Sequence, residues 1–560
     1  MWCLGINDGN FHDHSACLYH NSELVYFIEE ERLCKQKNAK SQKRSLCVQA
    51  CVNKAHLKIQ DLDIIAIGGD PLYLNQDMTL AQSLSFLGEP DEVMQITNRV
   101  QVINHHLAHA SSAYRTSGLD NALVIVVDGS GDGCSFSVYL GEGNHLKLIE
   151  SKDITQSLGW LFEAATSYLG LGGFQHVGKT MALAALSDVS GNFPLIEVEN
   201  GDYKLSIPNS LITQAKHITN RKMIKYLKKE LFKHFYHVFE SMGVSQGSPQ
   251  NKDLLSGLTS YIEPNASASR LAALLQKSVT DCIHVVLKKY LKRYPVEGVC
   301  FSGGVALNCK LMGTLIDLLD KNQVLYIPPI ANDAGLSMGA ALEVLSQAGL
   351  NNRDKLQHAY WGDSFNDDEI YAYLKNLGLS CKKIDSPSVY AAEKIAQGKI
   401  VAWFQGKMEM GPRALGNRSI LARPDRVNLK DRINKQIKNR EPWRPFSPSA
   451  TSDGCKNWLN AEYASPYMSI ALSASVPTFE LKGVCHIDRT SRVQVLEIQT
   501  NPRFYNLIKN LGALIGQEVV LNTSLNIAGM PITHRPYDAL CVFFGTPIDI
   551  AIFGKTVIQK

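Results

Sequence analysis

The segment "ALVIVVDGSGDGCSFSVYLG" (residues 122–141) decides the fold, because it joins two strand-like runs through a glycine-rich turn. Its first run is apolar and mostly β-branched, as in the buried strands of α/β sheets. Asp128 follows that run directly, at the carboxyl end of the strand, where α/β folds place their ligands. The segment therefore predicts an α/β domain with a functional site beside Asp128.

A second hairpin of the same kind begins the chain. "WCLGIND" and "SACLYHNSELVYFIEEER" are typical of strands, with a turn at Asn21-Ser22. Further strand-like runs alternate with long helical stretches, which is the pattern of α/β proteins. These runs lie at residues 63–69, 298–304 and 322–329, with a helix predicted at 269–294. Two hairpin-plus-helix units, near residues 1 and 122, predict a duplicated two-lobed domain.

The length and a break in composition predict two main domains. A chain of 560 residues is too long for one core, and a new α/β region begins near 345–365. We therefore expect a first domain at 1–350 and a second at 351–560, with a helical insert at about 188–268. Within the insert, the helix expected at 220–243 carries lysines opposite its apolar positions. That basic face is either a solvated surface or a lid over an acidic substrate.

Charge and composition exclude several classes of protein. A net charge of +4 gives no support to nucleic-acid binding, and no run of roughly 18 apolar residues predicts a membrane span. Asp8 comes too early for a signal peptide. The 13 cysteines form no CxxC pair and are expected to be reduced core residues. These features predict a cytoplasmic protein.

Two histidines and two aspartates are candidate metal ligands. His105 and His109 are four positions apart, so on a helix they share one face. This spacing alone is weak, because such histidines are more often structural. Asp128 and Asp333, the latter in a glycine-adjacent turn before a helix, would complete a site for Fe(II), Mn(II) or Zn(II). The sequence does not choose among these metals.

Glycine-rich turns and a basic cluster predict phosphate binding. The turn 128–133 follows a strand, and the segment 301–313 joins a strand to a helix; their glycines let a phosphate approach the backbone, although neither is a Walker loop. In the second half, arginine and lysine gather among glycines and prolines, where they can surround a polyanion. The candidates are Arg413, Arg418, Lys438, Arg440, Arg444 and Arg492.

At these residues the chain resembles the O-carbamoyltransferases of antibiotic and nodulation-factor biosynthesis. The motifs that carry the resemblance cover nearly the whole chain, in order: "FHDHSA", "EEER", "HHLAHA", "DGSGDG", "FSGGVALN", "NDAG", "GPRALGNRSI", "WRPFSPS", "NPRFY" and "NTSLNIAGMPI". The resemblance implies a two-lobed actin/hexokinase-like domain, similar to threonylcarbamoyl transferases, followed by a YrdC-like α/β domain. It implies that the second domain makes carbamoyl adenylate from carbamoyl phosphate and ATP. The first domain would then transfer the carbamoyl group to a hydroxyl.

The resemblance also implies roles for individual residues. His105, His109, Asp128 and Asp333 correspond to metal ligands, with Fe(II) as the expected ion. His12 and Asp13 match the transfer site, where a histidine base would take the proton of the acceptor hydroxyl. Lys438 and Arg492 are the expected catalytic cations of the activating site. Other residues expected to bind nucleotide or substrate are Lys179, Gly303, Gly304, Asn308, Arg413, Asn417, Arg418, Arg440, Arg444, Asn522, Ser524 and Asn526.

The expected partners are ATP with Mg(II), carbamoyl phosphate and a hydroxyl-bearing small molecule, with no nucleic acid and no membrane. A homodimer is one assembly to consider. The family's pattern is broken at Ala182, at Leu186-Ser187, and at Asn332 and Met530, which leaves the local loop shape and the acceptor pocket open. Two other functions stay open: a tRNA threonylcarbamoyl-type transferase and a non-catalytic nucleotide-binding scaffold. The sequence does not name the acceptor.

Overall fold

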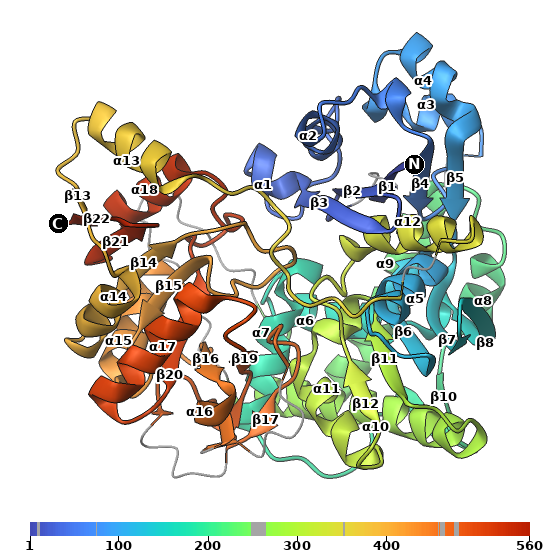
Figure 1. Cartoon of the computed structure of the whole chain (residues 1–560). Coiled ribbons are helices and arrows are strands. Elements are labelled where there is room, and N and C mark those ends of the chain that lie inside the picture. Colours follow the sequence, from blue (N-terminus) through green and yellow to red (C-terminus); the bar gives the residue numbers. More distant parts are fainter. Residues whose placement is uncertain are drawn as a thin grey trace. The chain divides into compact units, whose positions relative to one another are not determined.

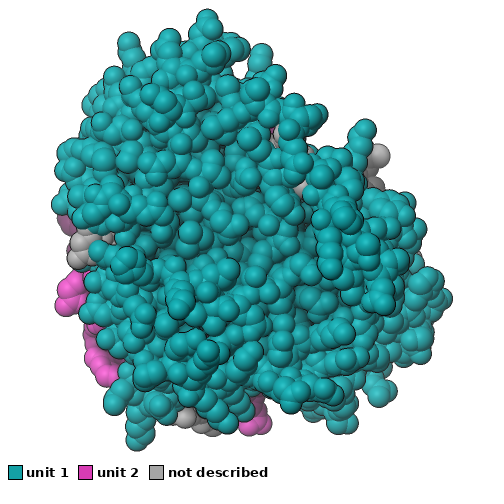
Figure 2. Space-filling model, turned by 90° about the vertical axis from the view of Figure 1, so that its right-hand side faces the viewer, with its two compact units in different colours: residues 1–34, 38–250, 263–356 teal, residues 35–37, 251–262, 357–560 magenta. Residues whose placement is uncertain are grey.

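The computed structural model describes residues 1–7, 12–73, 76–247, 265–350, 353–456, 458–459, 465–474 and 481–560. The chain divides into two compact units (Figure 2). Unit 1 comprises residues 1–34, 38–250 and 263–356, and unit 2 comprises residues 357–560 with two short segments, 35–37 and 251–262.

Unit 1 contains two five-stranded sheets with the same topology (Figure 1). The first has the order β3-β2-β1-β4-β5, from β1 (Trp2–Asn7), β2 (Ser15–His20), β3 (Glu23–Glu29), β4 (Ile64–Gly68) and β5 (Val100–Ile103). The second has the order β8-β7-β6-β11-β12, from β6 (Asn121–Gly131), β7 (Cys134–Glu142), β8 (His145–Asp153), β11 (Gly298–Ser302) and β12 (Val324–Tyr326). In both sheets an antiparallel meander continues into parallel strands. The predicted duplicated, two-lobed α/β fold is confirmed.

Ten helices of unit 1 surround these two sheets or pack on the helices that cover them. They are α1 (Glu30–Cys34), α2 (Leu46–Lys54), α3 (Leu80–Ser83), α4 (Pro90–Ile96), α5 (His105–Arg115), α6 (Leu158–Tyr168), α7 (Val177–Leu183), α10 (Ala266–Arg293), α11 (Cys309–Leu315) and α12 (Gly335–Gln347). Helix α12 packs on β1 and β4 of the first sheet and on α5, which packs on β6 and β11 of the second. Glycines permit this close approach: a Cβ on Gly68 would lie 2.6 Å from Leu336 O, and one on Gly339 would overlap Ala108 O.

We expect Gly339→Ala to lower the free energy of unfolding by about 1 to 3 kcal/mol, the usual cost of overpacking. The added methyl would force α12 away from α5, since the overlapping atom is backbone. Gly178→Ala is the matched control, because Gly178 is also helical and has open space where its Cβ would be. Urea unfolding measures both, and equal stability of the two variants would contradict the prediction.

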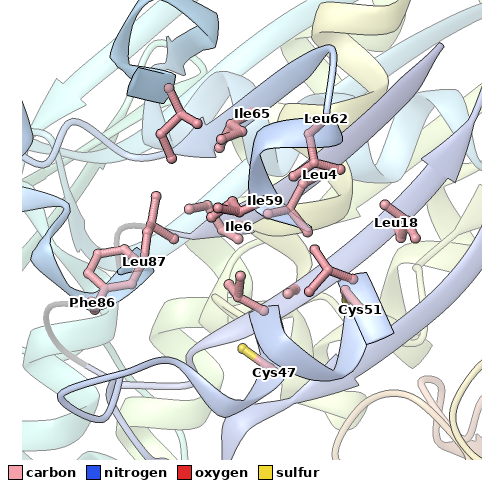
Figure 3. Close-up of a cluster of buried hydrophobic side chains, with 14 of the residues drawn as sticks. Leu4, Ile6, Leu18, Cys47, Cys51, Ile59, Leu62, Ile65, Phe86 and Leu87 are labelled. Carbon is pink, nitrogen blue, oxygen red and sulfur yellow. The ribbon is translucent and has the colours of Figure 1, made fainter. Parts of the chain in front are cut away.

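The core of the first lobe lies between its sheet and helix α2 (Figure 3). Leu4, Ile6 and Ile65 from the strands meet Cys47 and Cys51 from α2, and all are buried. All 13 cysteines are free thiols and nine of them are buried, as expected for small core residues.

The middle of unit 1 differs from the predicted helical insert, because it also contains a β-hairpin. It comprises β9 (Ile196–Glu199), β10 (Asp202–Leu205), α8 (Asn209–Ala215) and α9 (Arg221–Ser241), while residues 248–264 lie outside the described residues. Helix α9 begins at the cap Asn220 and buries an apolar stripe at Leu227, Leu231, Phe235 and Phe239. Apolar residues therefore lie opposite the lysines, as predicted, although Met223 near the start of the helix is exposed.

Lys228 differs from the exposed Lys225 of α9 because it is paired with Glu163 of the same unit. This pairing concerns the hypothesis that the basic face of α9 is a lid over an acidic substrate. The Nζ of Lys228 lies 3.0 and 2.8 Å from the two carboxylate oxygens of Glu163 and sits over the Trp160 ring. Lys228→Ala should therefore lower the free energy of unfolding by about 1 kcal/mol, through loss of the ion pair and the cation–π contact. The exposed Lys225→Ala should change it by no more than ~0.5 kcal/mol. Chemical unfolding tests this, and equal stabilities would show that the Glu163 contact contributes nothing.

Unit 2 contains an eight-stranded mixed sheet of order β13-β22-β21-β14-β15-β20-β16-β19. The strands are β13 (Lys382–Lys383), β14 (Val401–Phe404), β15 (Arg418–Ala422), β16 (Ser447–Thr451), β19 (Gln494–Leu496), β20 (Val519–Ser524), β21 (Ile550–Phe553) and β22 (Thr556–Gln559), with a small pair β17 (Leu472–Ser473) and β18 (Thr490–Ser491). The helices are α13 (Asp367–Asn376), α14 (Pro387–Ala396), α15 (Val427–Arg432), α16 (Ser452–Lys456), α17 (Pro502–Ile515) and α18 (Pro536–Phe544).

Helices α14 and α17 pack together over this sheet and form its main core with Trp403, Leu421 and Val520. This arrangement is mixed α/β, as predicted for the second half. Among the described residues of both units, no helix is long and apolar enough to cross a membrane.

Candidate functional site

Unit 1 brings the four predicted metal ligands together. One side-chain donor atom from each of His105, His109, Asp128 and Asp333 lies within 4.8 Å of all the others. Nε2 of His105 is 3.4 Å from Asp128 Oδ2, and Nε2 of His109 is 3.4 Å from Asp333 Oδ1. Separations of this size leave room for one ion at the centre of the group.

Local structure explains how each ligand reaches the group. Helix α5 is capped by Asn104, which accepts hydrogen bonds from the backbone of the first turn, so both histidines project from one face. Gly131 leaves the space that the His105 ring occupies, since a Cβ there would overlap the ring. Asp128 lies near the carboxyl end of β6, where the backbone N–H of Gly304 donates to its Oδ1 at 2.8 Å. Asp333 lies in the turn before α12.

The donor set fits a divalent cation. Nε2 of His105 and of His109 are buried and have no hydrogen-bond partner among the described residues. The other ring nitrogen of His109 lies 3.3 Å from Ser302 Oγ, which orients the ring. Two imidazole nitrogens and two carboxylates are ligands that Fe(II), Mn(II) and Zn(II) all accept.

Electrostatics at this group also favour positive charge. Burial alone lowers the pKa of His105, but the Asp128 carboxylate 3.4 Å from its Nε2 and the charge of Asp333 overcome it and raise the pKa to about 10. Burial opposes ionisation of Asp128, yet its histidine neighbours lower its pKa. The carboxylates that stabilise a proton here would stabilise a metal cation in the same way.

His106 does not join the group. Its Nδ1 lies 2.8 Å from Ser137 Oγ, and burial lowers its pKa to about 3, so it is a neutral structural residue. A second group of buried donors, His14, Glu30 and Cys47, is structural as well. Both ring nitrogens of His14 have hydrogen-bond partners, and the Glu30 carboxylate accepts from the first backbone N–H groups of α2.

His12 and Asp13 lie beside the candidate metal ligands. Nδ1 of His12 is 3.3 Å from Asp13 Oδ2 and 3.8 Å from Asp333 Oδ2. Burial lowers the pKa of His12, but Asp13 and then Asp333 overcome it and raise the pKa to about 9. The ring stacks on Phe174, whose ring centroid is 4.5 Å away and which is 37% exposed. The imidazole is therefore held between a carboxylate pair and an exposed aromatic side chain.

The predicted nucleotide-binding residues of unit 1 have different placements. Gly304 orients Asp128, and Gly303 adopts φ +89° where a Cβ would overlap the backbone of Val127. Asn308 caps α11 and exchanges hydrogen bonds with Gln276. Lys179 is buried on α7. A nucleotide contact by Gly303, Gly304, Asn308 or Lys179 stays a prediction.

Unit 2 contains a buried lysine held by the end of β20 and the residues that follow it. Lys438 comes directly after a π-helical segment, Ile433–Ile437, a distortion that occurs often at functional sites. Its Nζ donates to Asn526 Oδ1 at 2.6 Å, to Asn526 O at 2.9 Å and to Ser524 Oγ at 3.2 Å, and it also contacts Ser524 O. The structure thus brings the predicted residues Lys438, Ser524 and Asn526 into direct contact.

Three arginines extend this cationic group. Arg440 donates to Asn434 Oδ1 at 2.6 Å and lies over the Phe446 ring, while Arg492 donates twice to Ser447 Oγ. Burial, followed by the charge of Arg440, holds the pKa of Lys438 well below its usual value. Burial and the charges of Arg444 and Arg492 lower the pKa of Arg440 in the same way. Such mutual repulsion between a buried lysine and half-buried arginines indicates a site for an anion.

Two of the predicted asparagines and Arg418 are structural instead. The Arg418 side chain is fully buried, stacks on Phe404, and donates to the carbonyl oxygens of Gln405, Gly406 and Asp363. Asn417 and Asn522 are also buried, in hydrogen-bond networks with neighbouring side chains. This geometry gives no support to nucleotide contacts by these three residues. Arg413 lies half-buried in the loop between β14 and β15.

The sequence did not reveal several residues that position the site. Asn38 and Asn332 each donate a side-chain N–H to the Asp13 carboxylate, and Ser302 contacts His109. Asn332 drew attention only as an unusual residue beside Asp333. No local pattern marks Asn38, because it reaches Asp13 from 25 residues away.

Comparisons with known proteins identify carbamoyltransferase-like sequence over most of the chain. A family model described as Carbamoyltransferase N-terminus matches residues 83–342, and one described as Carbamoyltransferase C-terminus matches residues 392–560. Nodulation protein NolO of Bradyrhizobium diazoefficiens is 30% identical, over 82% of this chain and 79% of its own. The 3'-hydroxymethylcephem-O-carbamoyltransferase of Amycolatopsis lactamdurans is 29% identical, over 46% of this chain and 48% of its own.

Among solved structures, component A of (R)-2-hydroxyglutaryl-CoA dehydratase from Acidaminococcus fermentans is similar with a TM-score of 0.35 and 14% identity. The match covers 62% of this chain and 99% of that chain. Similarity this low does not assign a fold, so the fold described above rests on the strand order of this chain.

Proposed function

This chain belongs to the carbamoyltransferase family, and on that premise we propose that it is an ATP-dependent O-carbamoyltransferase. It cleaves carbamoyl phosphate, joins the carbamate to the AMP part of ATP with release of pyrophosphate, and transfers the carbamoyl group to a hydroxyl. The acceptor is a small-molecule natural product or a sugar. The observation that carries the proposal is that each unit has its own polar site: Lys438 with its arginines in unit 2, and His12 with four metal-ligating side chains in unit 1.

The cations of unit 2 suit the activating step. Lys438, Arg440, Arg444 and Arg492 bind the phosphates of carbamoyl phosphate and ATP, with the arginine forks as bidentate donors. Within the described part of this cluster, Glu441 is the carboxylate that pairs with Arg444, at 3.6 Å. Positive charge therefore exceeds negative charge, which stabilises the pyrophosphate as it leaves. Mg(II) accompanies ATP.

The residues of unit 1 suit the transfer step. The hydroxyl oxygen of the acceptor attacks the carbamoyl carbon, the carbon–oxygen bond to AMP breaks, and AMP leaves. Asp13 lies at Nδ1 of His12, so Nε2 is the nitrogen that accepts the hydroxyl proton, in the neutral form of the imidazole that predominates above its raised pKa of about 9. His105, His109, Asp128 and Asp333 would hold a divalent metal, Fe(II) by preference, which supplies positive charge that polarises the carbamoyl oxygen and offsets the neighbouring carboxylates.

The proposal is tested by incubating the purified protein with ATP, Mg(II) and carbamoyl phosphate, with and without candidate hydroxyl acceptors. Pyrophosphate should appear only when carbamoyl phosphate is present, and mass spectrometry should show acceptors that have gained one carbamoyl group. Metal analysis of the same sample identifies the bound ion. A protein that binds ATP but releases no pyrophosphate under any of these conditions would be a scaffold instead.

A further inference from the structure

Three side-chain amides surround Asp13 at the transfer site. Nδ2 of Asn38 donates to Asp13 Oδ1 at 2.6 Å, and Nδ2 of Asn332 donates to Asp13 Oδ2 at 3.0 Å. Nδ2 of Asn7 donates to the backbone carbonyl of Asp13 at 3.0 Å and to that of Asp333 at 3.3 Å. These contacts leave Asp13 a single orientation, in which Oδ2 meets His12 Nδ1.

Two features that normally destabilise a protein occur in this arrangement: positive backbone φ angles and buried polar atoms without partners in the part of the chain that the structure describes. Asp13 and Asn38 both adopt φ +54°, in the left-handed region that most residues avoid. Oδ1 of Asn38 and Oδ1 of Asn332 are buried without a hydrogen-bond partner among the described residues. Backbone strain and unsatisfied buried polar groups persist mainly where function needs them.

Asn38 is itself held in place, so its amide can restrict the orientation of the Asp13 carboxylate. Its backbone N–H donates to Glu31 Oε2 on α1 at 2.7 Å, and Glu31 is paired with the buried Arg32. The amide of Asn38 therefore approaches Asp13 from a fixed anchor. Asn332 approaches from a distant part of the sequence, 319 residues from Asp13 and one residue before a candidate metal ligand.

We propose that Asn38 is a positioning residue, whose amide turns the Asp13 carboxylate toward His12 Nδ1 and thereby fixes the imidazole that takes the acceptor's proton. This inference rests on the proposed transfer function. It concerns hydrogen-bond geometry alone: Asn38 contacts neither His12 nor the four metal-ligating side chains through any hydrogen bond found in the structure.

Two substitutions distinguish the effect of the Asn38 side-chain amide from the effect of its backbone conformation. Asn38→Gly removes the amide but accepts φ +54° readily, whereas Asn38→Ala removes the amide and also strains the backbone. A positioning amide predicts that both variants lose kcat for carbamoyl transfer by about 10- to 100-fold, as outer-shell partners usually do. Pyrophosphate release dependent on carbamoyl phosphate, and metal content, should stay at wild-type levels.

The matched control is Asn200, which has φ +52° in the exposed turn between β9 and β10. Asn200→Gly and Asn200→Ala should both retain full transfer. If Asn38→Gly retains wild-type kcat while Asn38→Ala loses it, the role of Asn38 is limited to backbone conformation and the inference is wrong.

A crystal structure of Asn38→Gly provides a test that needs no acceptor. We expect Asp13 to turn away, so that its carboxylate no longer contacts His12 Nδ1. An unchanged contact would overturn the inference whatever the activity. Failure of the proposed function can be told apart from failure of this inference. If the proposed function is wrong, the wild-type protein carbamoylates no acceptor, and the crystal structure still decides whether Asn38 orients Asp13.

Discussion

Replacing Lys438 with methionine is expected to lower carbamoyl-phosphate-dependent pyrophosphate release by about 100- to 1000-fold, the usual effect of removing a charge-stabilising donor. The buried amino group of Lys438 donates to Ser524 and Asn526 at the end of β20 and lies among three arginines. Methionine fills the same space without the charge, so the leaving pyrophosphate loses its stabilising cation. A coupled assay for pyrophosphate measures the effect.

The matched control for Lys438 is Lys435→Met, three positions earlier in the π-helical segment, where the side chain is exposed. It should retain full pyrophosphate release. Circular dichroism and thermal unfolding should show that both variants are folded. Normal release by a folded Lys438→Met protein would remove this residue from the activating site.

His109→Ala should remove the metal and abolish carbamoyl transfer while pyrophosphate release continues. Removing a direct ligand should lower metal affinity and transfer activity by more than the roughly 10- to 100-fold that changes in outer-shell residues produce. The alanine leaves Asp333 Oδ1 without the imidazole 3.4 Å away, so the remaining donors hold a cation poorly. Inductively coupled plasma mass spectrometry measures metal content, and the two half-reactions are assayed separately.

His106→Asn is the control for His109, since His106 lies on the same helix and its Nδ1 contacts Ser137 rather than the metal-ligating group. Asparagine preserves a polar partner for Ser137, and metal content and transfer should remain. Full metal occupancy and full transfer in His109→Ala would mean that the histidines of α5 are structural. Equal loss of both half-reactions in a folded variant would contradict two separate sites.

The four candidate metal ligands could be predicted from the sequence because each of them lies in a local pattern. Histidines four positions apart share a helix face whatever else the chain does, and a β-branched run delivers Asp128 to a strand end. The duplicated hairpins were also visible, since strand periodicity and the turn at Asn21 involve only neighbouring residues. What local spacing could not show is that these strands and α12 bring His12 within 3.8 Å of Asp333.

For the basic residues, in contrast, the sequence did not distinguish a candidate binding residue from a structural one. Lys438 and Arg418 look equally suited to phosphate binding in the sequence, yet Lys438 lies among other cations and Arg418 is buried against backbone carbonyls. An arginine in a glycine-rich loop has no local feature that tells which direction its guanidinium will take. That direction depends on strand pairing between segments about a hundred residues apart, such as β15 and β20.

By itself, the sequence determined the α/β class, the repeated lobe, the helix face that carries His105 and His109, and the family to which the motifs belong. These follow from short-range periodicity and from motif order along the chain. Only the tertiary structure decided that Arg418 is structural, that Lys228 is paired with Glu163, and that Asn38 and Asn332 hold Asp13. The physical reason is that a side chain's partners depend on which distant backbone segments pack together, and packing is a property of the whole fold.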